Sequence, residues 1–329
     1  MTGNQVSVIG AGAFGSALAL TFARAGRDVL LWGRDGARMS AMAETRRCGA
    51  ALGGMPLDIR IVPTSDLAAA CKPAVLVVAI PTQDLGDVAR LMAPYVSSRA
   101  AIISAAKGIE RKTGFFVTEI LQEALGPHRF GVISGPSFAV DIARGLPTAI
   151  SLAMPDAGDA VDLAQFLSSP VLRLYHTADV RGVEIGGAAK NVLAIAAGIV
   201  AGMGLGESAR AAMITRGFAE LRRYAAAFGA RPETLMGLSG LGDLVLTASS
   251  PQSRNYSLGL ALGAGKTLAE ANPSGKLAEG AFTAAILGET ARRRGVEMPI
   301  VEAVANVLDG VLSVRAAVQA LMTRPLKAE

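Results

Sequence analysis

The sequence has 329 residues, 51% of them apolar and 18% charged, so it can fill about two hydrophobic cores and leaves little scope for long disordered regions. The net charge is +5, with basic residues spread along the chain and only four Tyr and one Trp, which argues against a nucleic-acid stacking surface and suits small anions. Two Cys and two His, none at metal-ligand spacing, exclude a disulfide framework and predict no metal site.

The first half of the chain alternates short β-branched runs with helical stretches. The runs that predict strands are residues 6–9, 29–32, 75–80, 101–104, 130–134, 148–152 and 171–176. Residues 15–25 and 83–91 have helical spacing, and the unbroken apolar run 75–80 is typical of a strand covered on both faces. This alternation predicts an α/β fold with a doubly wound parallel sheet.

After His176 the pattern becomes helical and rich in alanine. In residues 209–228, apolar side chains recur at intervals of three and four, and no further strand is expected. We therefore divide the chain into a Rossmann-like dinucleotide-binding domain, residues 1–185, and an all-α substrate-binding and catalytic domain, residues 186–329.

An apolar stretch, residues 191–206, raises the question of a membrane. It is sixteen residues long, shorter than the roughly 20 needed for a span, and consists largely of Ala and Gly. We expect a buried helix whose small residues allow close approach of another helix or of a second subunit. The sequence begins without a signal-like segment, so no membrane span and a cytoplasmic location are expected.

A glycine motif, GAGAFG at residues 10–15, follows the first expected strand and opens a helix. In that context Gly10 permits a tight turn, Gly12 lets the backbone approach a pyrophosphate, and Gly15 allows close packing of helix on strand. The helix N-terminus would present free N–H groups to the anion. The motif predicts a dinucleotide site.

The end of the second strand bears on the choice of cofactor. Enzymes specific for NAD tend to place a carboxylate here, where this chain has Gly33 and Arg34, with Asp35 one position later. Arg34 could pair with a 2′-phosphate, which favours NADPH/NADP and leaves NADH/NAD possible. An exposed surface arginine is the alternative for Arg34, since the nearby Arg38 could serve instead.

Further polar residues lie in apolar or glycine-rich surroundings. These segments are residues 104–108, 135–139, 186–191, 237–247 and 253–255. Lysines in such surroundings are rare unless they are paired or functional, which singles out Lys107 and Lys190.

The segments GVEIGGAAKN (182–191), GLSGLGDL (237–244) and QSRN (252–255) are the most specific features of the chain. With the glycine turn and residues 295–300, they resemble the bacterial-type NAD(P)-dependent glycerol-3-phosphate dehydrogenases over essentially the full length. The resemblance implies a Rossmann-like domain followed by an all-α domain of the 6-phosphogluconate-dehydrogenase type. It also implies reversible reduction of dihydroxyacetone phosphate to sn-glycerol 3-phosphate, which supplies a phospholipid precursor.

The resemblance further implies residue roles. Lys190 would give a proton to the carbonyl oxygen, Asp243 would orient Lys190 or the substrate, and Lys107 would contact substrate and cofactor. Other substrate contacts would come from Gly135, Ser137, Ser253, Arg254 and Asn255. Other cofactor contacts would come from Ala13, Phe14, Ala139, Arg254, Leu277 and Glu279. Two alternatives stay open: Asp243 also reads as a helix start, and Ser137 as a turn residue after Pro136.

Two other functions fit parts of the sequence. A β-hydroxyacid dehydrogenase of the same two-domain build also uses a helix-borne lysine, but does not need the donors at 253–255. A non-enzymatic dinucleotide sensor would keep the glycine turn without needing Lys107, Lys190 and Asp243 together. A homodimer is expected from the frequency of symmetric dimers among oligomers.

Overall fold

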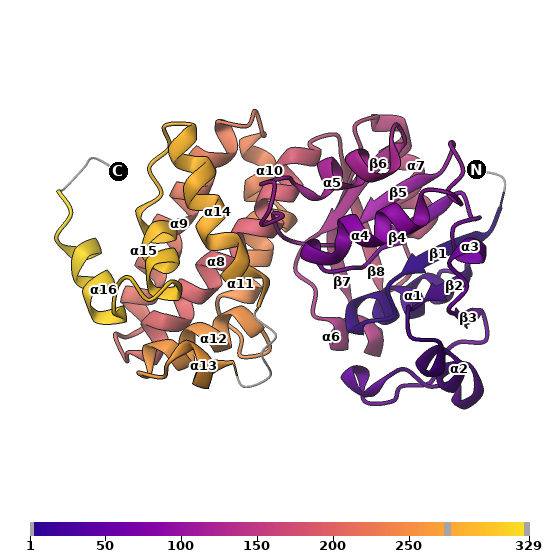
Figure 1. Ribbon diagram of the computed structural model, residues 1–329, viewed down its shortest axis with the longest axis horizontal. Coiled ribbons are helices and arrows are strands. Elements are labelled where there is room, and N and C mark those ends of the chain that lie inside the picture. Colours follow the sequence, from indigo (N-terminus) through magenta and orange to yellow (C-terminus); the bar gives the residue numbers. More distant parts are fainter. Residues whose placement is uncertain (1–2, 273–277, 326–329) are drawn as a thin grey trace. The chain divides into compact units, whose positions relative to one another are not determined.

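The computed structural model describes residues 3–272 and 278–325 (Figure 1). The chain divides into two compact units. Unit 1 comprises the residues up to Lys107 and Phe115–Glu184; unit 2 comprises Gly108–Gly114 and the residues from Ile185 onward. The short excursion Gly108–Gly114 is a feature that the sequence pattern does not reveal.

Unit 1 contains an eight-stranded sheet in the order β3-β2-β1-β4-β5-β6-β7-β8. The strands are β1 Gln5–Ile9, β2 Asp28–Trp32, β3 Ile61–Thr64, β4 Val75–Val78, β5 Ala101–Ser104, β6 Arg129–Ser134, β7 Thr148–Ala153 and β8 Leu172–Thr177. Strand β3 was not expected from the sequence. It is short and contains Pro63, which is tolerated because β3 lies at the edge of the sheet.

The sheet is mixed, whereas the sequence predicted a parallel one. Strand β7 pairs antiparallel with β6 and parallel with β8, while the other pairs are parallel. The connection between β6 and β7 contains only the six-residue helix α6, Ala139–Arg144. The chain therefore re-enters the sheet at the end where β6 leaves it, because a parallel return needs a longer crossover.

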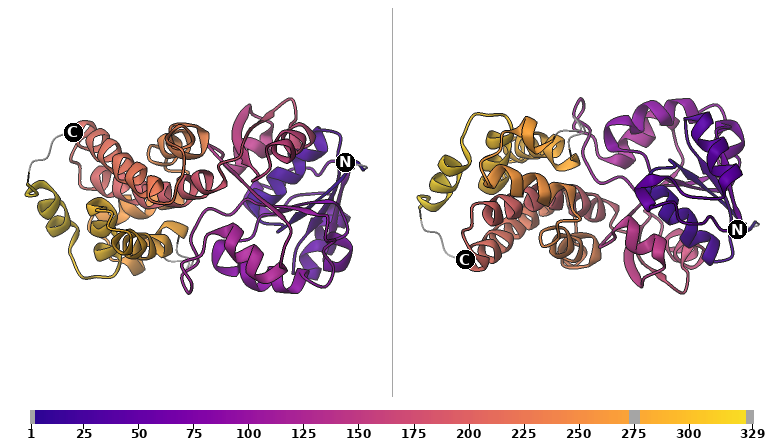
Figure 2. Two further views of the ribbon diagram at one scale, coloured as in Figure 1. Left: turned by 90° about the horizontal axis from the view of Figure 1, so that it is seen from above. Right: turned by 90° about the horizontal axis from the view of Figure 1, so that it is seen from below.

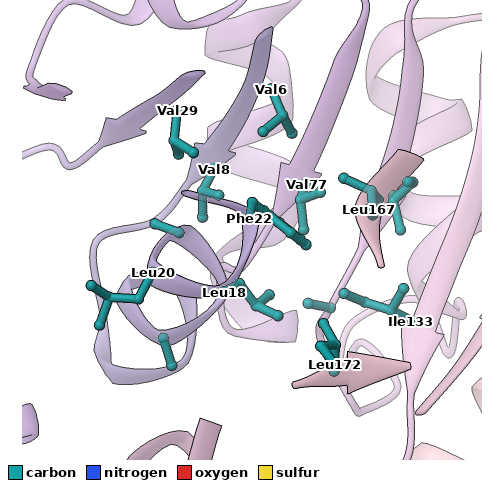
Figure 3. Packing of buried hydrophobic residues seen from close by; sticks show 14 of the residues in the cluster. Val6, Val8, Leu18, Leu20, Phe22, Val29, Val77, Ile133, Leu167 and Leu172 are labelled. Atoms are coloured by element: carbon teal, nitrogen blue, oxygen red, sulfur yellow. The ribbon is translucent and has the colours of Figure 1, made fainter. Parts of the chain in front are cut away.

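Helices cover both faces of this sheet (Figure 2). Besides α6 they are α1 Ala13–Arg24, α2 Gly36–Thr45, α3 Leu67–Ala70, α4 Thr82–Met92, α5 Val117–Leu125 and α7 Ala157–Leu167. On one face, Leu18 and Phe22 of α1 pack with Val6, Val8 and Val77 of the strands (Figure 3). On the other face, Leu76 and Val78 pack against α4 and α5. Strand β4 is apolar at every position because both faces are buried.

From Ile185 onward, the regular elements in the described part of unit 2 are helices. Its helices are α8 Val180–Gly202, which begins in unit 1, α9 Glu207–Ala226, α10 Pro232–Met236, α11 Asp243–Thr247, α12 Arg254–Gly263, α13 Leu268–Ala271, α14 Glu279–Arg293, α15 Pro299–Leu308 and α16 Val314–Met322. A π-helical turn, Leu238–Gly242, directly precedes α11. Helix α8 is long and apolar enough to span a bilayer, but 89% of its most apolar stretch is buried inside the protein, as expected for a core helix.

Helices α8 and α12 pack in direct backbone contact. A Cβ on Gly198 would lie 2.1 Å from the carbonyl oxygen of Tyr256, and a Cβ on Gly259 would lie 2.0 Å from that of Ile195. Gly202 and Gly263 meet the partner helix equally closely further along, so the two helices run in the same direction. The small residues of α8 thus accommodate a helix of the same chain, one of the two occupants that the sequence left open.

Candidate functional site

The glycine turn lies between β1 and α1 in unit 1. Gly10 has φ +121°, and a Cβ on Gly15 would lie 1.9 Å from the carbonyl oxygen of Gly10, so both positions require glycine. Gly12 is the exposed N-cap of α1, and as a glycine it has no side chain to cap the helix. A Cβ on Gly12 would meet nothing within 4 Å. The N-terminus of α1 is therefore open at Gly12, and a helix N-terminus with room beside it suits an anion such as a pyrophosphate.

Two arginines lie after β2, close to this turn in the fold. Arg34 is exposed. The side chain of Asp35 caps α2 by accepting from the backbone N–H of Arg38 at 3.0 Å. The Arg38 guanidinium donates to the carbonyl oxygen of Ala11 at 2.7 Å, so it lies against the glycine turn. The carboxylate nearest to the usual NAD-selecting position is thus engaged as a helix cap.

Lys107 lies three residues beyond β5. Its Nζ donates to the carbonyl oxygen of Gly135 at 3.0 Å and lies 5.8 Å from the ring centroid of Phe14. Gly135 has φ +154°, and the Ser137 hydroxyl also donates to its carbonyl oxygen, at 2.9 Å. The structure therefore brings Phe14, Lys107, Gly135 and Ser137 together from the carboxyl ends of β1, β5 and β6, where parallel sheets bind ligands. Ala13 and Ala139, at the starts of α1 and α6, pack on the core beneath.

A second cluster lies entirely in unit 2. Lys190 Nζ donates to Asp243 Oδ1 and to Thr247 Oγ1, both at 2.7 Å, and Thr247 Oγ1 donates to Asp243 Oδ1 at 3.2 Å. All three residues are buried. This triangle of Lys190, Asp243 and Thr247 holds an ammonium group against a carboxylate and fixes its position from two directions.

Asp243 is the first residue of α11 and Gly242 its N-cap, so the Asp243 side chain serves the ion pair. Thr247 was not singled out from the sequence. The available signal was its spacing of four residues from Asp243, which places both side chains on one face of α11.

The N-terminus of α12 lies beside the residue that follows Lys190. Asn255 donates from Nδ2 to Asn191 Oδ1 at 3.0 Å and accepts from the backbone N–H of Gly280 at 3.0 Å. Asn255 thereby joins α8, α12 and α14, a bracing role that the sequence did not suggest. Ser253 caps α12 by accepting from the N–H of Tyr256, and Arg254 is exposed at the first position of the helix.

Two predicted contacts remain, Glu279 and Leu277. Glu279 is the first residue of α14, and Leu277 lies outside the described residues. In residues 3–272 and 278–325, no group of three or more His, Cys, Asp or Glu could hold a metal ion. A surface hollow of about 430 Å³ lies elsewhere, between α7 and β8, and includes Gln165, Arg173 and His176 but none of the predicted site residues.

A Rossmann-like sheet with a glycine turn, followed by helices that carry a buried lysine–carboxylate pair, defines the class of two-domain dinucleotide-dependent dehydrogenases. The family described as NAD-dependent glycerol-3-phosphate dehydrogenase matches with its N-terminal part at residues 5–160 and its C-terminal part at residues 179–319. The chain belongs to this family.

Individual relatives match over nearly the whole chain. A glycerol-3-phosphate dehydrogenase [NAD(P)+] of a Bradyrhizobium species is 55% identical over 98% of each chain. That of Azorhizobium caulinodans is 56% identical over 99% of this chain and 98% of its own. The crystal structure of glycerol-3-phosphate dehydrogenase from Coxiella burnetii is 37% identical, covers 98% of this chain and 99% of that one, and superposes with a TM-score of 0.92.

Proposed function

We propose that the chain catalyses the reversible reduction of dihydroxyacetone phosphate to sn-glycerol 3-phosphate with NAD(P)H. The proposal rests on the buried triangle of Lys190, Asp243 and Thr247. Asn191, the residue after Lys190, bonds to Asn255 at the N-terminus of α12. The full-length relatives named above support the choice of substrate. Unit 1 is proposed to bind the dinucleotide, and unit 2 to bind substrate and supply the proton.

The glycine turn would hold the cofactor, with pyrophosphate at Gly12 and the first turn of α1, and with Ala13, Phe14 and Ala139 alongside. The open space at Gly12 fits this group. When bound, the reduced nicotinamide supplies the hydride. Arg34 would pair with the 2′-phosphate of NADPH, while NADH remains a usable cofactor. Lys107, Arg254, Leu277 and Glu279 are the further cofactor contacts that we propose.

Lys190 is proposed as the proton donor in the reduction. An ordinary lysine is an ammonium near neutral pH, so it already carries a proton. The substrate carbonyl oxygen needs that proton when hydride transfer turns the carbonyl into an alkoxide. Asp243 and Thr247 hold Nζ in one position, which reduces the reorganisation required when the proton moves. In the oxidation the same nitrogen must accept a proton, which favours alkaline conditions for that direction.

Donor groups for the substrate are proposed at both units. Ser253 and Arg254 supply a hydroxyl and a forked cation for the phosphate, at the positive end of α12. An amide nitrogen carries two N–H groups, and one of those on Asn255 donates to Asn191. Asn255 would thus orient the phosphate donors while offering one of its own. Lys107, Gly135 and Ser137 complete the proposed substrate contacts.

The biological role that we propose is supply of the glycerol 3-phosphate backbone for glycerophospholipid synthesis in the cytoplasm. We also propose that the protein acts as a homodimer. Neither proposal affects the chemistry at Lys190.

The test is NADPH oxidation, followed by absorbance at saturating dihydroxyacetone phosphate. Turnover that depends on this substrate supports the proposal. Turnover only with a β-keto acid would make the enzyme a β-hydroxyacid dehydrogenase instead. Tight dinucleotide binding without turnover on either substrate would favour a sensor and contradict the proposal.

A further inference from the structure

The chain passes between the two units three times: after Lys107, after Gly114 and after Glu184. The third passage occurs within helix α8, which begins in unit 1 and continues into unit 2. Lys190 lies on the same helix, six residues beyond Glu184. The direction in which α8 leaves unit 1 therefore bears directly on the position of Lys190.

A buried carboxylate fastens the first turns of α8 to unit 1. Glu184 Oε1 accepts from the backbone N–H of Thr118 at 2.9 Å and from its hydroxyl at 2.8 Å. The Glu184 side chain is only 2% exposed. Thr118 lies in the first turn of α5, just after the second passage between the units. Glu184, the last residue of α8 in unit 1, is thus bonded to the segment by which the chain returns to unit 1 after Gly114.

A second residue of α8 strengthens the same connection. Arg181 donates to Glu119 Oε1 at 2.6 Å, stacks 4.0 Å from the ring centroid of Phe116, and lies 3.4 Å from Glu184 Oε2. Glu119 also accepts from the backbone N–H of Phe116, at 2.8 Å. We call Phe116, Thr118, Glu119, Arg181 and Glu184 the α8 clamp.

The clamp contains a buried carboxylate, that of Glu184, whose charged form is disfavoured by desolvation. Burial raises the pKa of Glu184, while Arg181 and the bonds from Thr118 act in the opposite direction. A buried ion pair of this kind contributes little net stability compared with apolar side chains of similar volume. None of the clamp residues belongs to the proposed binding or proton-transfer groups. Its hydrogen bonds and ion pairs do, however, hold the first turns of α8 against the start of α5.

We propose that Arg181, Glu184 and Thr118 are positioning residues for Lys190, a role that rests on the proposed function. Six residues of helix correspond to about 9 Å, so a tilt of about 5° at the clamp displaces the Lys190 backbone by about 0.8 Å. Misplacement of a catalytic group by about 1 Å can cost about 10²-fold in rate. Loosening the clamp therefore lowers kcat without touching the cofactor turn.

The experiment compares Glu184→Gln, Arg181→Met and Thr118→Val with the wild-type enzyme, well below every melting temperature. We expect kcat with dihydroxyacetone phosphate to fall about tenfold for Glu184→Gln and Arg181→Met, and less for Thr118→Val. The Kd for NADPH, measured by fluorescence, stays within about twofold. Thr118→Ser keeps the hydroxyl and restores kcat.

Arg129→Met is the matched control, because Arg129 pairs with Asp159 at 2.6 Å within unit 1 but does not contact α8 through that pair. It leaves kcat within about twofold of wild type. If Glu184→Gln does not fold, the comparison of Thr118→Val with Thr118→Ser decides. Unchanged kcat in the folded clamp variants, or an equal loss in Arg129→Met, overturns the inference. Lack of wild-type turnover would instead refute the proposed function.

Discussion

The glycine turn of unit 1 and the lysine triangle of unit 2 are built in opposite ways. The backbone of the turn requires glycine at Gly10 and Gly15, while Gly12 leaves an exposed, open position at the start of α1. The triangle consists of three buried side chains that bond to one another. Binding a large anion needs room and backbone donors, whereas proton transfer needs one group held in place.

Asp243→Asn removes the carboxylate of the triangle and is expected to lower kcat more than the turn, Arg34 and Glu220 variants described below. Without the carboxylate, the Lys190 ammonium loses its charge partner in a buried site, so the neutral amine is favoured and cannot donate a proton. We expect kcat to fall by about 10²-fold, the lower end of what a general acid contributes. Steady-state kinetics with dihydroxyacetone phosphate measure this, and an unchanged Kd for NADPH would confine the loss to unit 2.

Gly12→Ala and Gly15→Ala form a matched pair in the turn. A methyl group on Gly12 enters open space, so the melting temperature stays close to wild type while the Kd for NADPH rises about tenfold, equivalent to about 1.4 kcal/mol. A methyl group on Gly15 overlaps the Gly10 carbonyl oxygen and destabilises the fold by about 1–3 kcal/mol. Thermal unfolding and fluorescence titration distinguish them; tight NADPH binding by Gly12→Ala would contradict the placement of the pyrophosphate.

Arg34→Ala tests the proposed 2′-phosphate contact next to the turn. Loss of a charge-assisted hydrogen bond at an exposed site is expected to raise KM for NADPH several-fold, on the order of 1 kcal/mol. KM for NADH serves as the internal control because that cofactor has no 2′-phosphate. Equal changes for both cofactors would exclude Arg34 as the contact for the 2′-phosphate and leave Arg38 as the candidate for that contact.

Glu220→Gln has the smallest expected effect on catalysis. It tests whether the loss of a buried carboxylate outside the triangle leaves kcat unchanged. Glu220 of α9 accepts from the backbone N–H groups of Ile300 and Val301 at the start of α15, and burial raises its pKa to about 7. The folded protein therefore binds more protons than the unfolded chain between pH 4.5 and about 7. The free energy of unfolding consequently falls as the pH rises through this window, by at most about 1.4 kcal/mol per pH unit.

In Glu220→Gln this contribution to the slope disappears, as denaturant unfolding at several pH values would reveal. We expect kcat to remain within about twofold of wild type. A loss of kcat as large as that of Asp243→Asn would mean that the triangle has no special status among the buried polar groups of unit 2.

The sequence predicted those parts of the molecule that depend on local pattern. Residues 101–104 form β5 as expected, and the glycine turn lies where its motif placed it. The edge strand β3, with Pro63, lacks the apolar pattern of the central strands, and the reversal of β7 depends on the short α6. Neither feature has a strong local signal.

The same distinction applies to the candidate site. Lys190 and Asp243 could be selected because their glycine-rich surroundings are unusual, but the bond between them spans 53 positions in the chain. The bond between Lys190 and Thr247 and the bracing role of Asn255 form only when α8, α11, α12 and α14 pack together. Hydrogen bonds between side chains of distant helices leave little trace in local sequence.

The role of Lys190 as proton donor is tested by kcat of Lys190→Ala at saturating NADPH and dihydroxyacetone phosphate, with the Kd for NADPH measured on the same preparation. We expect kcat to fall by about 10²- to 10⁴-fold, the contribution of a general acid, while cofactor binding stays unchanged. A folded Lys190→Ala enzyme with near-normal kcat would contradict this role, because the proton would then come from another group.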